Sequence, residues 1–176
     1  MDEDLSELDE LVNELLSYAR LERLGVELER TSHNLSQWLT EQRPLLARNC
    51  RKPLTLQLSE PLQLKFDAPL LIRALNNLVR NADSYAQERI EIRLYRDTNA
   101  AVICVDDDGI GIPESERERV LEPFERVDNA RSRKSGGHGL GLSIVREIIQ
   151  QHQGRLLISE SPLGGTRIAI CLPIDD

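Results

Sequence analysis

The chain has 176 residues, of which 40% are apolar and 3% are aromatic. This length and hydrophobicity suit one globular domain with a short extension, and they exclude a wholly disordered protein. The net charge of −8 comes from 22 basic and 30 acidic residues, and it excludes a protein that wraps nucleic acid, because phosphate contacts require clustered cations.

The first predicted element is an amphipathic helix over residues 5–24, which ends near Gly25, a residue typical of helix C-caps. Its apolar residues recur at alternating three- and four-residue steps, the pattern of a helix that packs lengthwise against another helix. The residues of this stripe are Leu5, Leu8, Val12, Leu15 and Ala19. Two interpretations stay open, because the stripe suits either a partner helix in a dimer or the core of the same chain.

After Gly25 the pattern changes to mixed strands and helices. We expect a short strand over residues 26–30 and a helix that starts at Asn34. Pro44 lies inside this helical stretch and is expected to bend or break it, because proline lacks the N–H group that a helix interior needs.

Alternating apolar residues then predict two strands, at residues 54–58 and 62–66. The short connection at Glu60-Pro61 predicts that these strands pair as a hairpin. Asp67 is predicted to cap a long helix over residues 68–85.

The second half of the chain contributes two predicted strand pairs, one helix and a long segment rich in glycine and charge. The expected order is strands at 90–94 and 102–105, the long segment at 106–138, a helix at 140–153, and strands at 155–160 and 166–172. Runs of strands with helices between the pairs predict an α+β fold, a two-layer α/β sandwich in which a mixed sheet packs on helices.

Short signals for ligand binding lie between residues 77 and 166. The first is a pair of asparagines, Asn77 and Asn81, which a helix places one turn apart on the same face. Amide oxygens are suitable ligands for Mg²⁺, which retains several waters and takes few protein ligands. A pair of surface asparagines is also common without any function, so this signal is weak by itself.

The second signal is the run DDDGIGI over residues 106–112, which leaves the end of a predicted strand. A carboxylate there can accept a hydrogen bond from the exocyclic amine of adenine, and glycines let a flat base approach the backbone. The alternative is a calcium loop, since DxDxG also begins an EF-hand. No helix–loop–helix pattern flanks the run, so we reject calcium.

The third signal is the glycine-rich run GGHGLGLS over residues 136–143, which opens a predicted helix. Backbone N–H groups and the positive end of a helix dipole favour a phosphate at such a position. The spacing fits neither a P-loop nor a dinucleotide-binding fingerprint. The fourth signal, Gly164-Gly165-Thr166, is also compatible with an ordinary tight turn.

Together these segments resemble a known family. NLVRNADSY, DDDGIGIP, EPFERVD, GGHGLGLSIV and GGT are similar, in order, to the N, G1, F, G2 and G3 boxes of the sensor histidine kinases of two-component systems. The first predicted helix resembles the end of the second helix of that family's dimerisation and phosphotransfer domain. The resemblance therefore implies two parts, residues 1–25 from that helix and residues 26–176 as an ATP-binding catalytic domain of the Bergerat, GHKL or HATPase type.

The resemblance also implies roles for individual residues. Asn77 and Asn81 would hold Mg²⁺ on the phosphates of ATP, Tyr85 would stack on the adenine, and Asp107 would accept a hydrogen bond from its amino group. Arg126 would reach toward the terminal phosphate and would be catalytic together with Asn81. Residues 112–138 would form a mobile ATP lid. Further nucleotide-contacting positions are Gly109, Gly111, Ile112, Gly137, His138, Gly139, Leu140, Gly141, Leu142 and Thr166.

Three positions depart from the pattern of the family. Ser84 stands where the family often has lysine or arginine, Leu121 occupies the first aromatic position of the F box, and His138 replaces a small hydroxyl residue. Basic residues between 131 and 134 are candidates to replace the cation that is missing at position 84.

The acceptor histidine of the family is followed by an acidic residue and, a few positions later, by a proline. His33, His138 and His152 lack this context, so we expect the acceptor to precede residue 1 in a longer protein and this chain not to phosphorylate itself. The resemblance implies ATP and Mg²⁺ as cofactors. It implies a response regulator and the protein's own dimerisation and phosphotransfer domain as partners. It also implies a cytoplasmic piece, not itself membrane-inserted, of a bacterial inner-membrane sensor.

Other classes of function fit the sequence less well. A GHKL-type ATPase hydrolyses ATP with a glutamate one turn before the N-box asparagine, but Asn76 and Asn77 stand there. The first predicted helix argues against an anti-sigma serine kinase. A degenerate nucleotide-binding or dimerisation module stays open as an alternative, because Ser84 and Leu121 depart from the pattern of the family.

Overall fold

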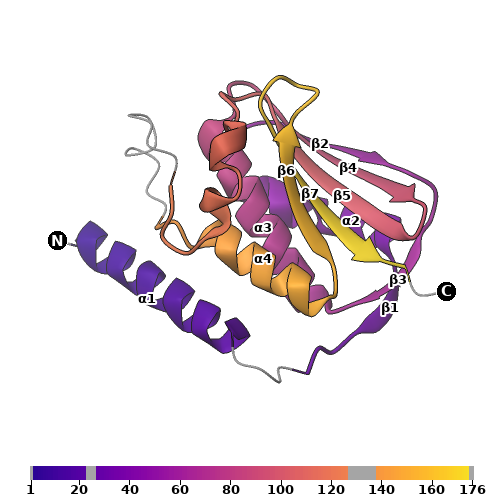
Figure 1. Cartoon of the computed structure of the whole chain (residues 1–176), viewed down its shortest axis with the longest axis horizontal. Coiled ribbons are helices and arrows are strands. Elements are labelled where there is room, and N and C mark those ends of the chain that lie inside the picture. The colour runs from indigo at the N-terminus through magenta and orange to yellow at the C-terminus, as the bar shows by residue number, and fades with distance from the viewer. Residues whose placement is uncertain (1, 23–26, 127–137, 175–176) are drawn as a thin grey trace.

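The computed structural model describes residues 2–22, 27–126 and 138–174, which form a mixed sheet with helices on one face (Figure 1). The elements in chain order are α1 (Asp2–Glu22), β1 (Thr31–Asn34), α2 (Leu35–Arg48), β2 (Leu54–Leu58), β3 (Gln63–Phe66), α3 (Ala68–Tyr85), β4 (Ile90–Asp97), β5 (Ala100–Asp107), the short 3₁₀ helices η1 (Glu114–Glu116) and η2 (Arg119–Leu121), α4 (Gly141–Gln151), β6 (Arg155–Glu160) and β7 (Thr166–Pro173).

The main sheet has five strands in the order β2-β4-β5-β7-β6. β2 runs parallel to β4, and the other neighbours are antiparallel. β1 and β3 form a separate antiparallel pair. This arrangement confirms the predicted α+β fold with a mixed sheet packed on helices.

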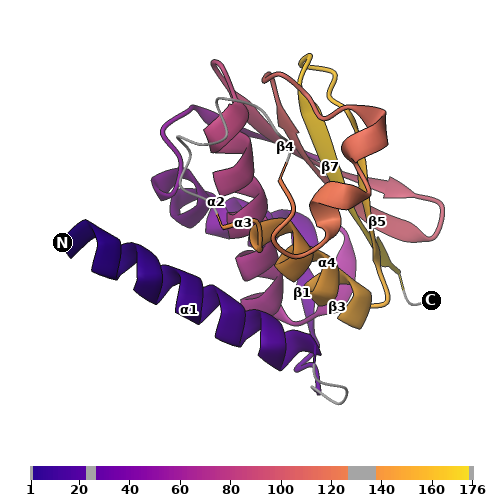
Figure 2. The ribbon, with the colours of Figure 1, turned by 60° about the vertical axis from the view of Figure 1, so that its left-hand side comes forward.

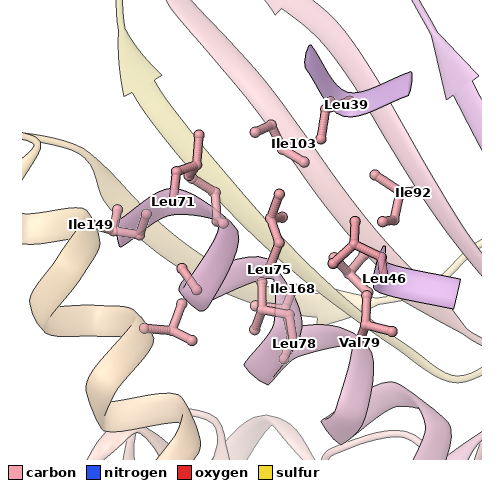
Figure 3. Close-up of a cluster of buried hydrophobic side chains, with 14 of the residues drawn as sticks. Leu39, Leu46, Leu71, Leu75, Leu78, Val79, Ile92, Ile103, Ile149 and Ile168 are labelled. Atoms are coloured by element: carbon pink, nitrogen blue, oxygen red, sulfur yellow. The ribbon is translucent and has the colours of Figure 1, made fainter. Parts of the chain in front are cut away.

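The core lies between the sheet and helices α2, α3 and α4. Alternation along β5 turns Ala101, Ile103 and Val105 toward the helices, where all three are buried. Figure 3 shows side chains from three helices and three strands meeting in this cluster, labelled Leu39, Leu46, Leu71, Leu75, Leu78, Val79, Ile92, Ile103, Ile149 and Ile168. Because the core is mostly aliphatic, with Trp38 and Phe66 as its buried aromatic residues among those described, its stability comes mainly from close packing of branched side chains.

The local signals at Asp67 and in the second half of the chain are confirmed. Asp67 is the N-cap of α3, and its side chain accepts a hydrogen bond from the Leu70 backbone N–H at 3.1 Å. The strand pair β4–β5, the helix α4 and the strand pair β6–β7 also lie where the alternation and the turn residues predicted them. A side-chain cap and an alternating pattern act over a few neighbouring residues, so each is readable without the rest of the fold.

The predicted hairpin between residues 54–58 and 62–66 is wrong. Both strands exist, but β2 pairs in parallel with β4, and β3 pairs with β1. The strand predicted over residues 26–30 is also wrong, because residues 27–30 have no regular structure and the strand begins at Thr31. Its position follows from its partner, since Thr31 lies opposite Phe66.

Pro44 does not end α2, which contains it and continues to Arg48. Leu39 and Leu46 lie on either side of the proline and are both fully buried. Burial of two leucines contributes on the order of 3–6 kcal/mol, which outweighs the cost of about 3 kcal/mol for a proline inside a helix.

Helix α1 lies along α4 (Figures 1 and 2). It packs on the core through Leu11, Tyr18 and Leu21, which share one face of the helix. The stripe residues whose side chains the structure describes lie on a neighbouring face and are exposed. They are Leu8, Val12, Leu15 and Ala19, with exposed fractions of 56% for Leu8 and 45% for Val12. The interpretation that this helix lies on the core of the same chain is therefore confirmed for the face that carries Leu11, Tyr18 and Leu21, and the packing of the exposed stripe on a partner helix stays a prediction.

His152 joins the end of α4 to the start of α3. Its Nε2 accepts the Asp67 backbone N–H at 3.1 Å, and its Nδ1 lies 2.7 Å from the Ile148 carbonyl oxygen. Both bonds together require a neutral ring with its proton on Nδ1. Burial lowers the pKa of His152, as does the charge of Arg30, while the bond to Ile148 and the charge of Asp67 oppose the shift.

Acidification is therefore expected to destabilise the fold through His152. As the pH falls, His152 takes up a proton in the unfolded chain before it does so in the folded chain. The stability that neutral His152 contributes is therefore complete above its ordinary pKa of 6.5, and it is lost as the pH falls through the folded pKa. We expect urea midpoints to fall as the pH is lowered below the ordinary pKa of 6.5. His152→Gln should cost about 1–3 kcal/mol near neutral pH and flatten the pH profile. A profile flattened equally by His33→Gln would contradict this assignment.

Candidate nucleotide site

A cavity of about 300 Å³ opens between α3, the segment after β5 and the start of α4. This volume lies at the lower end of the range for small-molecule sites. It gathers most of the residues that the sequence predicted, which are Asn77, Asn81, Tyr85, Gly111, Ile112, Arg126, His138, Gly139, Gly141, Leu142 and Thr166. Segments that are distant in the chain, from α3 to the start of β7, therefore meet at one site.

Helix α3 supplies one wall of the cavity. Asn77, Asn81 and Tyr85 follow each other at four-residue steps, so a helix aligns them along one face. All three line the cavity. The adjoining face of α3 carries Leu71, Leu75 and Leu78, which are fully buried in the core. Packing of the apolar face thus fixes the direction in which the polar face points.

The three consecutive aspartates after β5 point to three different places. Asp106 lies on the sheet face away from the helices and makes two hydrogen bonds of 2.8 Å with the Arg167 guanidinium. The side chain of Asp107, the next residue along β5, points to the face of the sheet that the helices cover. Asp108 accepts the backbone N–H groups of residues 87–89. Slight desolvation acts to raise the pKa of Asp108, but the backbone donors outweigh it and lower the pKa.

Asp107 is held beneath the cavity and is only 3% exposed. Its Oδ1 accepts hydrogen bonds from the backbone N–H groups of Gly109 at 2.8 Å and Thr166 at 3.1 Å. In the described residues, no hydrogen bond reaches Oδ2. Burial raises the pKa of Asp107, and the two backbone donors partly oppose the increase. The arrangement leaves one carboxylate oxygen for a ligand that donates a hydrogen bond.

The start of α4 forms another part of the wall. Its N-cap is Leu140, which offers no side-chain hydrogen bond, so the first backbone N–H groups of the helix lack a capping acceptor. Gly141 and Leu142 of this first turn line the cavity. An anion suits such an uncapped N-terminus, because orphan N–H groups and the helix dipole both favour negative charge.

The F and G2 boxes meet at the backbone. The Phe124 N–H donates to the Gly139 carbonyl oxygen at 2.9 Å. Gly139 has φ +78°, and a Cβ atom there would lie 2.9 Å from the Phe124 backbone, so a side chain is excluded. Leu121 is buried although it replaces an aromatic residue. Glu122 adds an ion pair with Arg146 at 2.7 Å.

Some predicted residues lie outside the cavity wall. Asp107 and Gly109 lie behind it, and Leu140 is fully buried in the core. Gly137 and residues 131–134 belong to segment 127–137, which lies outside the described residues. Residues 112–126 and 138, at the two ends of the predicted lid, are therefore the parts that the structure describes.

The cavity also contains residues that the sequence analysis did not predict. They are Glu14, Asn49, Arg80, Asp83, Ile110, Val120 and Glu125. Glu14 comes from α1, and its Oε2 lies 3.7 Å from His138 Nδ1. Asn49 follows α2, and it belongs to no short sequence motif that would have indicated a binding residue. Arg80 was recognisable, because it stands one helical turn before Ser84 on the asparagine face of α3.

Residues 66–176 match the family model described as histidine kinase-, DNA gyrase B-, and HSP90-like ATPase. The match begins just before α3 and includes β5, α4 and β7, the elements around the cavity. The chain therefore belongs to this ATPase family.

Named relatives specify the type within the family. The sensor histidine kinase CpxA of Escherichia coli (strain K12) is 38% identical over 170 residues, which cover 95% of this chain and 37% of CpxA. The sensor protein RstB of the same strain is 37% identical over 176 residues, covering 99% of this chain and 41% of RstB. The chain thus spans about two fifths of the length of these relatives. It is an ATP-binding catalytic domain of the sensor histidine kinase type.

A solved structure agrees with this assignment. The mycobacterial sensor histidine kinase MprB superposes with a TM-score of 0.69 at 28% identity, over 82% of this chain and 97% of that chain. In the part of the chain that the structure describes, no helix combines the length and the apolar character that crossing a membrane requires.

Proposed function

We propose that this chain binds Mg·ATP in the cavity and, within a longer protein, transfers the γ-phosphoryl group to a histidine. One observation carries the proposal. The buried carboxylate of Asp107 lies behind one part of a cavity whose α3 wall presents the amides of Asn77 and Asn81. The carboxylate suits the amino group of adenine, and the amides suit a magnesium ion on the phosphates.

The base is assigned to the part of the cavity near Asp107. The free Oδ2 would accept the adenine amino group, while Tyr85 would stack on the ring. Gly111, which lines the cavity, would leave this part open to a flat base, with Ile112 and Thr166 beside it. Gly109 would help from behind the wall, where a Cβ atom would lie 2.4 Å from the Tyr85 carbonyl oxygen. Discrimination against guanine follows, because guanine carries a carbonyl oxygen where adenine carries an amino group.

The phosphates are assigned to the uncapped start of α4. Gly139 and Gly141, with Leu140 and Leu142, would present backbone N–H groups to them, and the same role is proposed for Gly137. Arg126 would approach the terminal phosphate, with His138 beside it. Of these positions, Gly137 lies outside the described residues, and the others line the cavity except for Leu140.

The residues present also fit Mg²⁺. In the described residues, no group of three or more His, Cys, Asp or Glu side chains forms a complete metal cage. Mg²⁺ needs no such cage, because it retains waters and binds phosphate oxygens together with one or two protein ligands. Asn77 and Asn81 would supply those ligands. The bound ion would neutralise charge on the phosphates during transfer.

The chain itself would contribute positioning. Asp107 and Tyr85 would hold the base, and the first turn of α4 would hold the phosphates, so that the terminal phosphate points out of the cavity. We propose that residues 1–25 continue the dimerisation and phosphotransfer domain that carries the acceptor, and that residues 26–176 form the catalytic domain. A response regulator would then receive the phosphoryl group. We propose that the reaction takes place in the cytoplasm, where ATP is available.

Calorimetric titration with Mg·ATP and Mg·GTP tests the proposal. We expect ATP to bind with a dissociation constant in the micromolar to low-millimolar range and GTP much more weakly, because Oδ2 of Asp107 faces a donor in adenine only. Binding of neither nucleotide would favour a degenerate module. Transfer is tested with labelled ATP and a separate acceptor domain, where we expect label on the acceptor and none on this chain alone.

A further inference from the structure

The cavity lacks a basic residue at the position where the resemblance leads one to expect it. Ser84 stands at this position, is exposed and lines the cavity. Its hydroxyl donates to the carbonyl oxygen of Arg80 at 3.0 Å, within the same helix. A neutral hydroxyl that bonds its own helix backbone offers no charge to a phosphate.

Arg80 lies one turn earlier on the same face of α3. It lines the nucleotide cavity and also a neighbouring hollow of about 430 Å³, together with Asn49 and Asn77. Arg80 is exposed, and among the described residues its guanidinium takes part in no hydrogen bond or ion pair. It therefore stands at the junction of the two hollows without a protein partner in the described part of the chain.

Arg80 supplies positive charge to a cavity wall that also carries acidic side chains. The wall carries the carboxylates of Glu14, Asp83 and Glu125, which repel phosphates. Asp83 is compensated, because it accepts the Arg51 backbone N–H at 2.8 Å and the Arg51 guanidinium at 3.2 Å. A guanidinium beside Asn77 would meet phosphate oxygens with several parallel donors, which suits it better than a hydroxyl.

We infer that Arg80 binds the terminal phosphates of the nucleotide and replaces, from one turn away, the cation that is absent at position 84. The inference rests on the proposed binding of Mg·ATP and assigns a phosphate-specific role to a side chain outside the glycine boxes. Residues four apart on a helix have neighbouring Cβ atoms, and the long arginine side chain spans the remaining distance.

The test compares ligands with and without phosphates. We expect Arg80→Gln to weaken Mg·ATP binding by about tenfold or more, since hydrogen bonds to charged groups are the stronger class. Binding of adenosine should be unchanged, because it lacks phosphates. Adding Ser84→Lys to Arg80→Gln should restore most of the lost affinity for Mg·ATP.

Arg73→Gln is the matched control. Arg73 lies on the same helix and lines the neighbouring hollow, but it does not line the nucleotide cavity. It should leave Mg·ATP binding near the wild-type value. Wild-type affinity in Arg80→Gln, an equal loss for adenosine, or an equal effect of Arg73→Gln would each overturn the inference. Failure of the wild-type chain to bind Mg·ATP would instead overturn the proposed function.

Discussion

Asp107→Asn is expected to abolish measurable ATP binding and to preserve the fold. The asparagine Oδ1 can keep both hydrogen bonds that Gly109 and Thr166 donate to Asp107 at 2.8 and 3.1 Å. The other oxygen, however, becomes an NH₂ group, so two donors face each other when adenine enters. Leaving buried donors unpaired costs on the order of 3 kcal/mol, which lowers the affinity by about 100-fold or more.

Calorimetry on the folded variant measures this effect, and thermal unfolding confirms that the domain is intact. Asp97→Asn is the matched control, because it removes the same charge from the exposed last residue of β4. It should bind ATP like the wild type. ATP binding that survives in Asp107→Asn would remove the basis for assigning the adenine to this carboxylate.

Gly165→Ala is expected to lose both ATP binding and stability. A Cβ atom at this position would lie 2.2 Å from Asp107 Oδ1 and 2.3 Å from the Gly109 backbone nitrogen. The contacts cannot relax independently, because Oδ1 is itself bonded to the Gly109 N–H. The turn before β7 must therefore move away from the end of β5. Overpacking of this kind costs about 1–3 kcal/mol, and the displaced Thr166 N–H no longer holds the carboxylate.

Gly141→Ala provides the control for stability. A Cβ atom there meets no heavy atom within 4 Å, and alanine in a helix is favoured over glycine by about 0.5–1 kcal/mol. Guanidinium unfolding should therefore show Gly165→Ala destabilised and Gly141→Ala unchanged or slightly more stable. Equal unfolding midpoints for the two variants would contradict the steric argument.

The two variants also separate the roles of one cluster. Asp107→Asn removes the acceptor for the base and keeps the backbone contacts, whereas Gly165→Ala disturbs those contacts themselves. A domain that only binds a partner protein through its surface would also be destabilised by Gly165→Ala. Because such a domain would bind no nucleotide, Asp107→Asn would have no nucleotide binding to abolish.

The candidate site was predictable where its residues lie in short motifs. Asn77, Asn81 and Tyr85 share a helical face because a helix repeats every few residues, and the sequence shows that spacing directly. Gly139 and Gly141 open a helix whose pattern is equally local. Asp107 was singled out among its neighbours by the resemblance alone. The structure adds the physical reason, which is that strand alternation sends Asp106 and Asp107 to opposite faces of the sheet.

The features that the sequence analysis missed depend on contacts between segments that are distant in the chain. Residues 54–58 and 62–66 look like a hairpin because they are close in sequence, but β2 finds a better partner in β4 and β3 pairs with β1. Pro44 breaks a helix in isolation, whereas burial of the surrounding leucines keeps α2 intact. Glu14 and Asn49 reach the cavity only because α1 and α2 pack beside α3 and α4.

The sequence by itself determined the elements of this protein and the chemistry of its boxes, because caps, alternation and glycine turns depend on interactions between near neighbours. Only the tertiary structure decided which strands pair, which face of α1 meets the domain and which charges surround the cavity. These choices depend on contacts such as that between Thr166 and Asp107, 59 residues apart. The free energy that favours these contacts comes from burial and hydrogen bonding between distant segments. The local sequence pattern of one segment does not indicate which other segment it contacts.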